Sequence, residues 1–280
     1  MSNNQIMVSI HCLAYNHEKY ISDALDSFIM QKTSFAFEVL IHDDASTDGT
    51  AEIIREYEKK YPDIIKPIYQ TENQYSKHVS IFRTYQLPRM KGKYYAVCEG
   101  DDYWTDPYKL QKQYDAMENH PEVDICSHKA LLVDSSDKSI ISVSAPAQEN
   151  CIIPVERVIE GGGGFVMTNS LFVRNRFDAE NYPFRLNNTY DYSLQIAGSL
   201  RGGMLYLSDC MSAYRVLSQN SWVKTQAKDP KLRKQHMKKV QLMLNQLNID
   251  TNNKYKKSIN KVLRRNKYLY YARCIKNILR

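Results

Sequence analysis

The sequence lacks the long apolar runs, clustered cysteines and internal repeats that mark several classes of protein. None of its 280 residues lies in a run of 18 consecutive apolar residues, so no transmembrane helix is expected. The N-terminus has no basic start followed by an apolar stretch, so no secretory signal is visible. The six cysteines form no Cys-x-x-Cys pair, which favours buried thiols in a reducing compartment. We therefore expect a cytoplasmic protein without disulfides.

Acidic residues are nearly absent from the end of the chain. Residues 221–280 contain 17 lysines and arginines against only Asp229 and Asp250, a balance of +15. Residues 1–220 contain 21 basic and 29 acidic residues, a balance of −8. The formal net charge of +7 therefore combines an acidic body with a strongly basic tail. Nucleic acid is not an expected partner, because the tail carries no recognisable motif and the body would repel a phosphate backbone.

The first half of the chain alternates short apolar runs with helical patterns. We expect strands at residues 6–13, 37–41, 64–69, 94–98 and 123–127, with helices between them and Asn16 capping the first helix. This order is typical of an α/β protein whose parallel sheet is covered on both faces. Such sheets bind ligands at the carboxyl ends of their strands.

The second half has a less regular pattern. Strands are expected at 139–144, 171–173 and 204–207, with a separate extended segment at 213–216. A short helix is expected at 155–159, and a longer one begins at Asp191 and ends near Leu200. The four consecutive glycines at 161–164 indicate a loop, and the chain turns helical beyond residue 222.

Clustered carboxylates follow two of the predicted strands. Asp43-Asp44 follows the second strand, and Glu99-Gly100-Asp101-Asp102 follows the fourth. Carboxylates this close together repel one another unless a cation compensates them, and hard oxygen ligands suit Mg²⁺ or Mn²⁺. The alternative is a solvated acidic turn that caps the next helix. Capping explains Asp48 and Thr50, but it does not explain two adjacent aspartates at the carboxyl edge of a sheet.

Three segments together resemble the nucleotide-sugar half of the inverting family 2 glycosyltransferases of bacterial polysaccharide synthesis. They are Leu13-Ala14-Tyr15-Asn16 after the first strand, Asp43 to Thr50 after the second and Glu99 to Asp102 after the fourth. The resemblance covers roughly residues 6–220 and implies a GT-A-like, Rossmann-type α/β sandwich with a mostly parallel central sheet. It implies a glycosyltransferase domain at 1–220, with a nucleotide-sugar half at about 1–125 and an acceptor half at about 126–220. Residues 221–280 then form a basic helical tail.

The resemblance also implies roles for individual residues. Asp102 would bind the Mn²⁺ or Mg²⁺ ion that bridges the diphosphate of the donor, and Asp101 would sit near the ribose. Asp43 or Asp44 would hydrogen-bond the nucleotide base. Glu99 stands where the family often has the first acid of an Asp-x-Asp motif. The full set of expected nucleotide-sugar contacts is Ala14, Tyr15, Glu18, Asp43, Asp44, Glu99 and Asp101.

The resemblance assigns the catalytic base to Asp191, at the start of a helix in the acceptor half. Inversion requires a base that removes the proton of the acceptor hydroxyl as it attacks the anomeric carbon. The alternative for Asp191 is a helix-start charge that the helix dipole favours. Tyr214-Arg215 resembles the family's Tyr-Arg segment, and Leu217 stands where many members have a histidine.

The end of the tail, residues 254–280, combines basic residues with apolar residues at roughly helical spacing. Such a helix can lie on an anionic membrane surface and bring the protein to lipid-linked acceptors at the inner face of the membrane. The alternative is a helical pair that packs on the body or forms a homodimer. The expected partners are thus a UDP-sugar donor, a glycan or lipid-linked acceptor and, through the tail, a membrane surface.

The residues leave two other functions as alternatives. A sugar-nucleotide nucleotidyltransferase would also use paired aspartates and a metal ion. Such enzymes usually carry a Gly-rich, basic loop after the first strand, where this chain has Ala14-Tyr15-Asn16-His17. A non-enzymatic protein that binds membranes through its tail would leave the acidic pairs unexplained.

Overall fold

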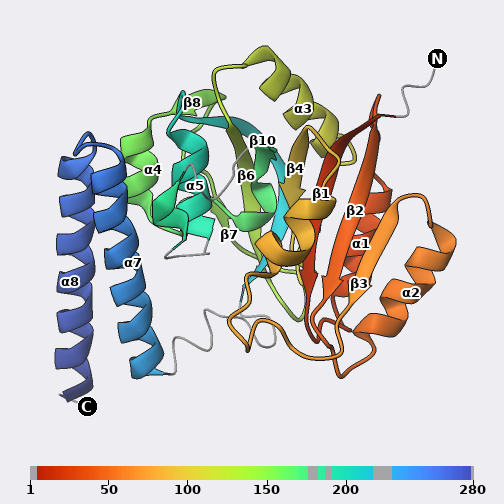
Figure 1. Ribbon diagram of the computed structural model, residues 1–280, viewed down its shortest axis with the longest axis horizontal. Coiled ribbons are helices and arrows are strands. Elements are labelled where there is room, and N and C mark those ends of the chain that lie inside the picture. Colours follow the sequence, from red (N-terminus) through yellow and green to blue (C-terminus); the bar gives the residue numbers. More distant parts are fainter. Residues whose placement is uncertain (1–4, 176–181, 187–190, 217–228, 279–280) are drawn as a thin grey trace.

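A computed structural model of the chain describes residues 5–175, 182–186, 191–216 and 229–278. Within these ranges one sheet of ten strands has the order β3-β2-β1-β4-β9-β6-β10-β5. Of the two remaining strands, β7 pairs with β6 and β8 pairs with β10. Helices pack against the sheet, and a long helical hairpin lies at one side of the molecule (Figure 1).

The first part of the sheet, β3-β2-β1-β4, is entirely parallel. Each short apolar run forms a strand, and the connections between them contain helices, as expected for βαβ units. The strands are β1 (Ile6–Ala14), β2 (Ala36–Asp43), β3 (Ile65–Tyr69) and β4 (Tyr94–Val97). The connecting helices are α1 (Ile21–Ile29), α2 (Thr50–Lys60) and the short turns η1 (Phe82–Gln86) and η2 (Leu87–Arg89).

Antiparallel strands join the sheet in its second part. The first of them, β9, lies between β4 and β6 and is antiparallel to both. The strands here are β5 (Tyr103–Trp104), β6 (Ile125–Asp134), β7 (Ile140–Ser144), β8 (Cys151–Ile153), β9 (Phe172–Arg174) and β10 (Met204–Val216). The segments expected separately at 204–207 and 213–216 form the single strand β10, whose register against β6 shifts around Cys210. The break in the apolar pattern therefore reflects extra residues in a bulged strand and not a loop.

The sheet is buried on both faces, in two hydrophobic cores. Along β4 the side chains alternate, so that Tyr94 and Ala96 join one core while Tyr95 and Val97 join the other. The first core includes side chains of α1, α2 and α3 (Lys109–Asn119). The second includes side chains of α4 (Val155–Gly161), α5 (Asp191–Ser199), α7 (Pro230–Asp250), α8 (Lys256–Ile278) and the short turn η4 (Pro183–Arg185).

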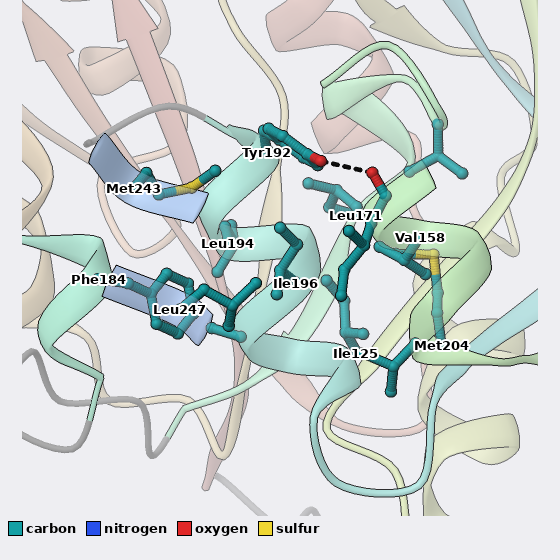
Figure 2. Close-up of a cluster of buried hydrophobic side chains, with 14 of the residues drawn as sticks. Ile125, Val158, Leu171, Phe184, Tyr192, Leu194, Ile196, Met204, Met243 and Leu247 are labelled. Carbon is teal, nitrogen blue, oxygen red and sulfur yellow. Dashed lines mark hydrogen bonds between the residues drawn. The ribbon is translucent and has the colours of Figure 1, made fainter. Parts of the chain in front are cut away.

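The helical hairpin of α7 and α8 packs on the body and shares its second core. Figure 2 shows Met243 and Leu247 of α7 beside Leu194 and Ile196 of α5. Ile259 of α8 is buried in the same core. Of the two alternatives for the basic tail, a helical pair packed on the body describes this part of it. No helix within the described ranges is long and apolar enough to span a membrane.

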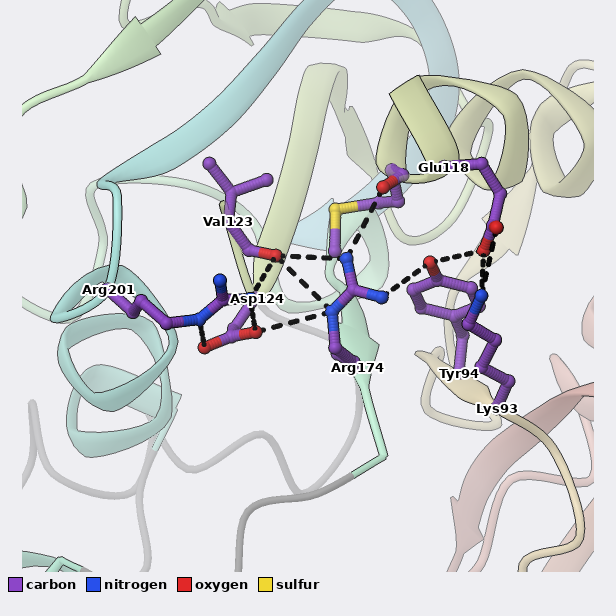
Figure 3. A network of polar contacts seen from close by, with 8 residues as sticks. Lys93, Tyr94, Glu118, Val123, Asp124, Arg174 and Arg201 are labelled. Carbon is purple, nitrogen blue, oxygen red and sulfur yellow. Dashed lines mark hydrogen bonds and ion pairs between the residues drawn. The ribbon is translucent and has the colours of Figure 1, made fainter. Parts of the chain in front are cut away.

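A polar network joins the amino-terminal ends of β4 and β6 to the end of β9 (Figure 3). Asp124, which directly precedes β6, accepts a hydrogen bond from Arg201 Nε at 2.8 Å and pairs with Arg174 Nε at 3.3 Å. Arg174 also donates to the Tyr94 hydroxyl at 2.9 Å, and that hydroxyl donates to Glu118 at 2.6 Å. Because this network lies at the amino ends of the parallel strands, its role is to hold the sheet together, far from the carboxyl edge.

Candidate active site

The ends of the central parallel strands are tied together at the carboxyl edge of the sheet. The backbone N–H of Asp44, just after β2, donates to the Ala14 carbonyl at 2.9 Å. The N–H of Gly100, just after β4, donates to the Leu13 carbonyl at 2.8 Å. The end of β1 therefore lies between the two acidic turns, and the segments picked out from the sequence meet at one edge.

The loop after β1 is fixed to the loop after β2 by side-chain hydrogen bonds. Asn16 has a positive φ of 55°, and its side-chain oxygen accepts a bond from Thr47 N at 2.8 Å. Its own N–H donates to Ser46 Oγ at 2.9 Å, and Glu18 N donates to Asp48 Oδ2 at 3.1 Å. The expectation that Asn16 caps the first helix is wrong, because this residue turns the chain and α1 begins only at Ile21. Tyr15, between β1 and this turn, is 39% exposed at the edge.

The two aspartates after β2 have different partners. Asp44 accepts hydrogen bonds from two backbone amides, Gln74 N at 2.7 Å and Tyr75 N at 3.0 Å, so both of its carboxylate oxygens are engaged. Asp43 Oδ1 accepts a bond from the Ser46 hydroxyl at 2.5 Å, and its Oδ2 accepts a long bond from Ser46 N at 3.4 Å. Burial raises the pKa of the Asp43 carboxyl. Asp44 thus anchors the segment around residue 74, while Asp43 Oδ2, with only this long bond, keeps more capacity to accept a bond from a ligand.

Asp102 lies in the turn after β4 with one carboxylate oxygen bonded and the other unpartnered. Its Oδ1 accepts a hydrogen bond from Arg215 N at 2.8 Å. Its Oδ2 is buried and has no hydrogen-bond partner among the described residues. Burial raises the pKa of this carboxyl, and the neighbouring charge of Asp101 adds to the effect. A divalent cation fits this position, because it would be the missing partner of Oδ2 and would offset the crowded negative charge.

Arg215, near the end of β10, holds the acidic turn in place. Its Nη1 donates to the Asp101 carbonyl at 2.6 Å, and its Nη2 pairs with Asp23 of α1. The guanidinium also stacks over the ring of Tyr103, 4.6 Å from the ring centroid. The Tyr-Arg segment noted in the sequence thus connects the last strand to the metal-binding candidate. Leu217, which follows it, lies outside the described residues.

Asp191 begins α5 and accepts a hydrogen bond from the hydroxyl of Thr168. Burial raises the pKa of the Asp191 carboxyl, while the bond from Thr168 acts in the opposite direction. The charge of Asp191 also acts on Glu99. Desolvation raises the pKa of Glu99 to about 8, and the negative charges of Asp101 and Asp191 contribute to this rise. The structure therefore brings the candidate base and the acidic turn to the same partly buried region.

Two further side chains lie here, Tyr214 and His17, for which no role is expected from the sequence. Burial raises the pKa of the Tyr214 hydroxyl, and the nearby charges of Asp102, Glu99, Asp101 and Asp191 raise it further. The Nδ1 of His17 is buried without a hydrogen-bond partner among the described residues, and a Cβ on Gly100 would lie 2.9 Å from it. The position of Tyr214 beside Arg215 was the only available signal for either residue.

The glycine loop at 161–164 borders the helix of Asp191. Gly162 has a positive φ of 79°, which favours glycine at this position. Gln195, one helical turn after Asp191, donates to the Gly163 carbonyl at 3.1 Å. The loop is thus attached to α5, the helix that Asp191 begins.

Within the described ranges, no group of three or more histidine, cysteine, aspartate or glutamate residues is arranged to hold a metal ion. A cation at Asp102 would therefore need ligands from elsewhere, such as phosphate oxygens.

Comparison with known proteins relates most of the chain to one family of enzymes. The family model for glycosyl transferase family 2 matches residues 9–216. An uncharacterized protein of Mycobacterium tuberculosis is 34% identical over 217 residues, which are 77% of this chain and 60% of that protein. The putative teichuronic acid biosynthesis glycosyltransferase TuaG of Bacillus subtilis is 29% identical over 236 residues, which cover 79% of this chain and 85% of TuaG. The chain thus spans about 60% of the length of its mycobacterial relatives.

Solved structures confirm the expected GT-A-like α/β fold. TarS of S. aureus (residues 1–349, in complex with UDP-GlcNAc) matches with a TM-score of 0.66 at 19% identity, covering 87% of this chain and 67% of that one. The mannosyltransferase PcManGT of Pyrobaculum calidifontis, in complex with GDP-Man and Mn²⁺, matches with a TM-score of 0.54 at 15% identity, covering 88% and 66%. At these identities the likeness concerns the fold, whereas the family model covers well over half of the chain. The chain therefore belongs to glycosyltransferase family 2.

Proposed function

We propose that this protein transfers a sugar from a nucleoside-diphosphate donor to a hydroxyl of a glycan or lipid-linked acceptor, with inversion at the anomeric carbon. The observation that carries the proposal is that carboxylates from two distant segments lie near Tyr214. Asp101 and Asp102 come from the turn after β4, and Asp191 comes from the start of α5. Asp101 and Asp102 suit a metal-bound diphosphate, and Asp191 suits a proton acceptor.

In the proposed reaction, Asp191 removes the proton of the acceptor hydroxyl. The acceptor oxygen forms a bond to the anomeric carbon while the bond from that carbon to the diphosphate oxygen breaks, and the nucleoside diphosphate leaves with the electron pair. The raised pKa of Asp191 supports this role, because a carboxylate with a higher pKa is a stronger base. Thr168 holds one oxygen of that carboxylate in a fixed direction.

The acidic turn would receive the leaving diphosphate. Asp102 Oδ2 is the residue atom that would hold a divalent cation, since it is buried and otherwise unpartnered among the described residues. When bound, Mn²⁺ or Mg²⁺ supplies positive charge that stabilises the departing diphosphate. Arg215 fixes the position of Asp102 through its backbone N–H and fixes the carbonyl of Asp101 through its guanidinium.

The remaining edge residues would bind the nucleoside. We assign the base contact to Asp43, because its Oδ2 accepts only a long bond of 3.4 Å from Ser46 N, whereas both oxygens of Asp44 accept bonds of 3.0 Å or less from backbone amides. Ala14, Tyr15 and Glu18 would line the same subsite, at the end of β1 and the loop beyond it. A UDP-sugar is the proposed donor; TarS, a fold neighbour, binds UDP-GlcNAc, although another neighbour, PcManGT, binds GDP-Man.

The proposed setting is the synthesis of a bacterial surface polysaccharide. Two relatives support it by name, TuaG and the poly(ribitol-phosphate) beta-glucosyltransferase of Bacillus spizizenii, which is 29% identical over 140 residues. The second of these matches only 50% of this chain and 22% of its own length.

Calorimetric titration with UDP and with UDP- and GDP-sugars, in Mn²⁺ and in EDTA, tests the metal and donor assignments. We expect binding of a UDP-sugar that requires the cation and that weakens at least tenfold in Asp102→Asn. The matched control is Asp63→Asn, since Asp63 is an exposed aspartate outside the edge. Equal affinity in EDTA, or in Asp102→Asn, would contradict the assignment of Asp102.

A further inference from the structure

The helical hairpin has one half that buries side chains against the body and one half in which no described side chain is buried. The buried side chains of α7 all lie in the half next to the hairpin turn: Val240, Met243, Leu244 and Leu247. On the other arm of the hairpin they are Tyr255, Ser258, Ile259 and Val262. Among the described side chains at 230–239 and 263–270, none is buried. We call these two stretches together the outer half of the hairpin.

The outer half carries positive charge without any acidic residue. Residues 230–239 include five lysines and arginines, and residues 263–270 include three more. Lys231, Lys234 and Lys238 are three and four residues apart on α7 and line one surface hollow together with Gln235. In the packed half, by contrast, Lys261 pairs with Glu160 of α4. A row of like charges on one helix face fits an extended anionic surface.

Exposed apolar side chains accompany these charges. Leu232 is 38% exposed on α7, and Tyr268 and Leu269 are 72% and 45% exposed on α8. Tyrosine and leucine among lysines are typical of surfaces that enter the interface of a bilayer. A nucleic acid would bind the basic side chains but would gain little from Leu232 or Leu269. A lipid surface therefore fits the outer half of the hairpin better.

The outer half also points toward the same end of the molecule as the candidate active site. In Figure 1, α7 begins and α8 ends at the lower end of the view, where β1 and β2 also end. Farther up α8, Arg265 lies beside the glycine loop, 3.6 Å from the place that a Cβ on Gly162 would occupy. The outer half therefore lies at the end of the molecule at which the carboxyl edge of the sheet also lies.

We propose that the outer half of the hairpin binds an anionic lipid bilayer, at the end of the molecule that carries the carboxyl edge of the sheet. The surface differs from the one expected from the sequence at 254–280. Residues 255–262 are largely occupied in packing on the body, whereas residues 230–239 of α7 contribute most of the basic face. Binding of this kind does not depend on the transfer reaction, so the two proposals can fail separately.

Sedimentation of the full chain with vesicles tests this proposal. Vesicles of phosphatidylcholine and phosphatidylglycerol in a three-to-one ratio are compared with vesicles of phosphatidylcholine alone. We expect binding only to the anionic vesicles, and weaker binding at higher salt. The triple variant Lys231→Gln, Lys234→Gln, Lys238→Gln should bind at least tenfold more weakly, because each lysine near such a surface contributes about fivefold.

Matched variants separate charge from lipid insertion. Lys59→Gln, Lys60→Gln and Lys91→Gln remove three exposed lysines outside the hairpin and should leave binding unchanged. Tyr268→Ser with Leu269→Ser should weaken vesicle binding without lowering the melting temperature, since both side chains are exposed. Equal losses in the two triple variants would overturn the proposal. Tighter binding to single-stranded RNA than to the anionic vesicles would also overturn it, and would make the patch a nucleic-acid surface.

Discussion

The carboxylates at the carboxyl edge differ in how many of their oxygens already have partners. Asp44 has both oxygens bonded to backbone amides, whereas Asp102 has one oxygen bonded and one buried without a partner among the described residues. Glu99 is half-buried, and desolvation together with the charges of Asp101 and Asp191 raises its pKa to about 8. Burying a carboxylate oxygen without a partner costs free energy, and a cationic ligand at this edge would offset that cost.

Substitutions of Asp43 and Asp44 should have different effects on nucleotide binding and on thermal stability. Asp43→Ala should weaken nucleotide binding with little change in the melting temperature, because Asp43 holds only the Ser46 turn. Asp44→Ala removes two backbone partners and should lower stability by about 1–3 kcal/mol. Calorimetry with UDP and thermal melts of both variants measure the two effects. Loss of binding in Asp44→Ala alone would reverse the assignment of the base contact.

Lys109 is a fully buried lysine that should make the stability depend on pH. Its Nζ lies 4.0 Å from the centroid of the Trp104 ring and donates to Gln113 at 2.7 Å. Burial lowers the pKa of Lys109 to about 7, so from pH 7 to about 10 the unfolded chain binds this proton and the folded chain does not.

Stability of the wild type should therefore rise relative to Lys109→Met as the pH increases over that window. Below pH 7 the difference should be constant, and there Lys109→Met should be the more stable of the two, because the charged lysine is costly to bury. Urea unfolding of both proteins between pH 6 and pH 10 provides the comparison. A difference that does not change with pH would mean that Lys109 titrates near its ordinary pKa in the folded protein.

At the level of elements, the parallel strands of the first half could be predicted because they are short apolar runs with helical patterns between them. The acidic turns could be predicted because they end such runs. The two-residue strand Tyr103–Trp104 and the three-residue strand Cys151–Ile153 could not, since their pairing with β10 leaves no periodic signal. Asn16 was misread because a helix cap and a left-handed turn favour the same residue type.

The site could be predicted only in part for a related reason. Strand ends indicated which acids lie at the edge, and the family resemblance added Asp191 from a distant segment. Neither the strand ends nor the resemblance indicated that backbone amides donate to both oxygens of Asp44. Neither indicated that His17 and Tyr214 lie near the carboxylates of this edge. Those facts depend on how loops from different elements meet, which no local pattern encodes.

The hairpin should unfold together with the body. Leu247 of α7 is fully buried in the core that also contains Ile125 of β6 and Ile196 of α5. Leu247→Ala should lower the free energy of unfolding by about 3 kcal/mol. The matched control Leu242→Ala, at a side chain that is 51% exposed on the same helix, should change it by less than about 0.5 kcal/mol. Circular dichroism should follow one transition; separate transitions for hairpin and body would contradict a shared core.

On the scale of the whole molecule, the two halves of the chain each contribute one side of the candidate site. The parallel half contributes the acidic turn and the loops after β1 and β2. The second half contributes Asp191, Thr168 and the strand that ends in Tyr214-Arg215. Arg215 connects the two halves directly, through Asp101 and Asp102 on one strand end and Asp23 on α1. This division matches a reaction with two substrates that must meet at one carbon atom.

The central claim is that Asp191 acts as the base of an inverting transfer, and the most direct test is Asp191→Asn. With the nucleotide sugar that binds in the titration, both donor affinity and release of the nucleoside diphosphate are measured. We expect unchanged donor affinity and a loss of turnover of about 10²–10⁴-fold, because the amide cannot accept the proton. Turnover within a few-fold of the wild type would contradict it and would reduce Asp191 to a charge at the start of a helix.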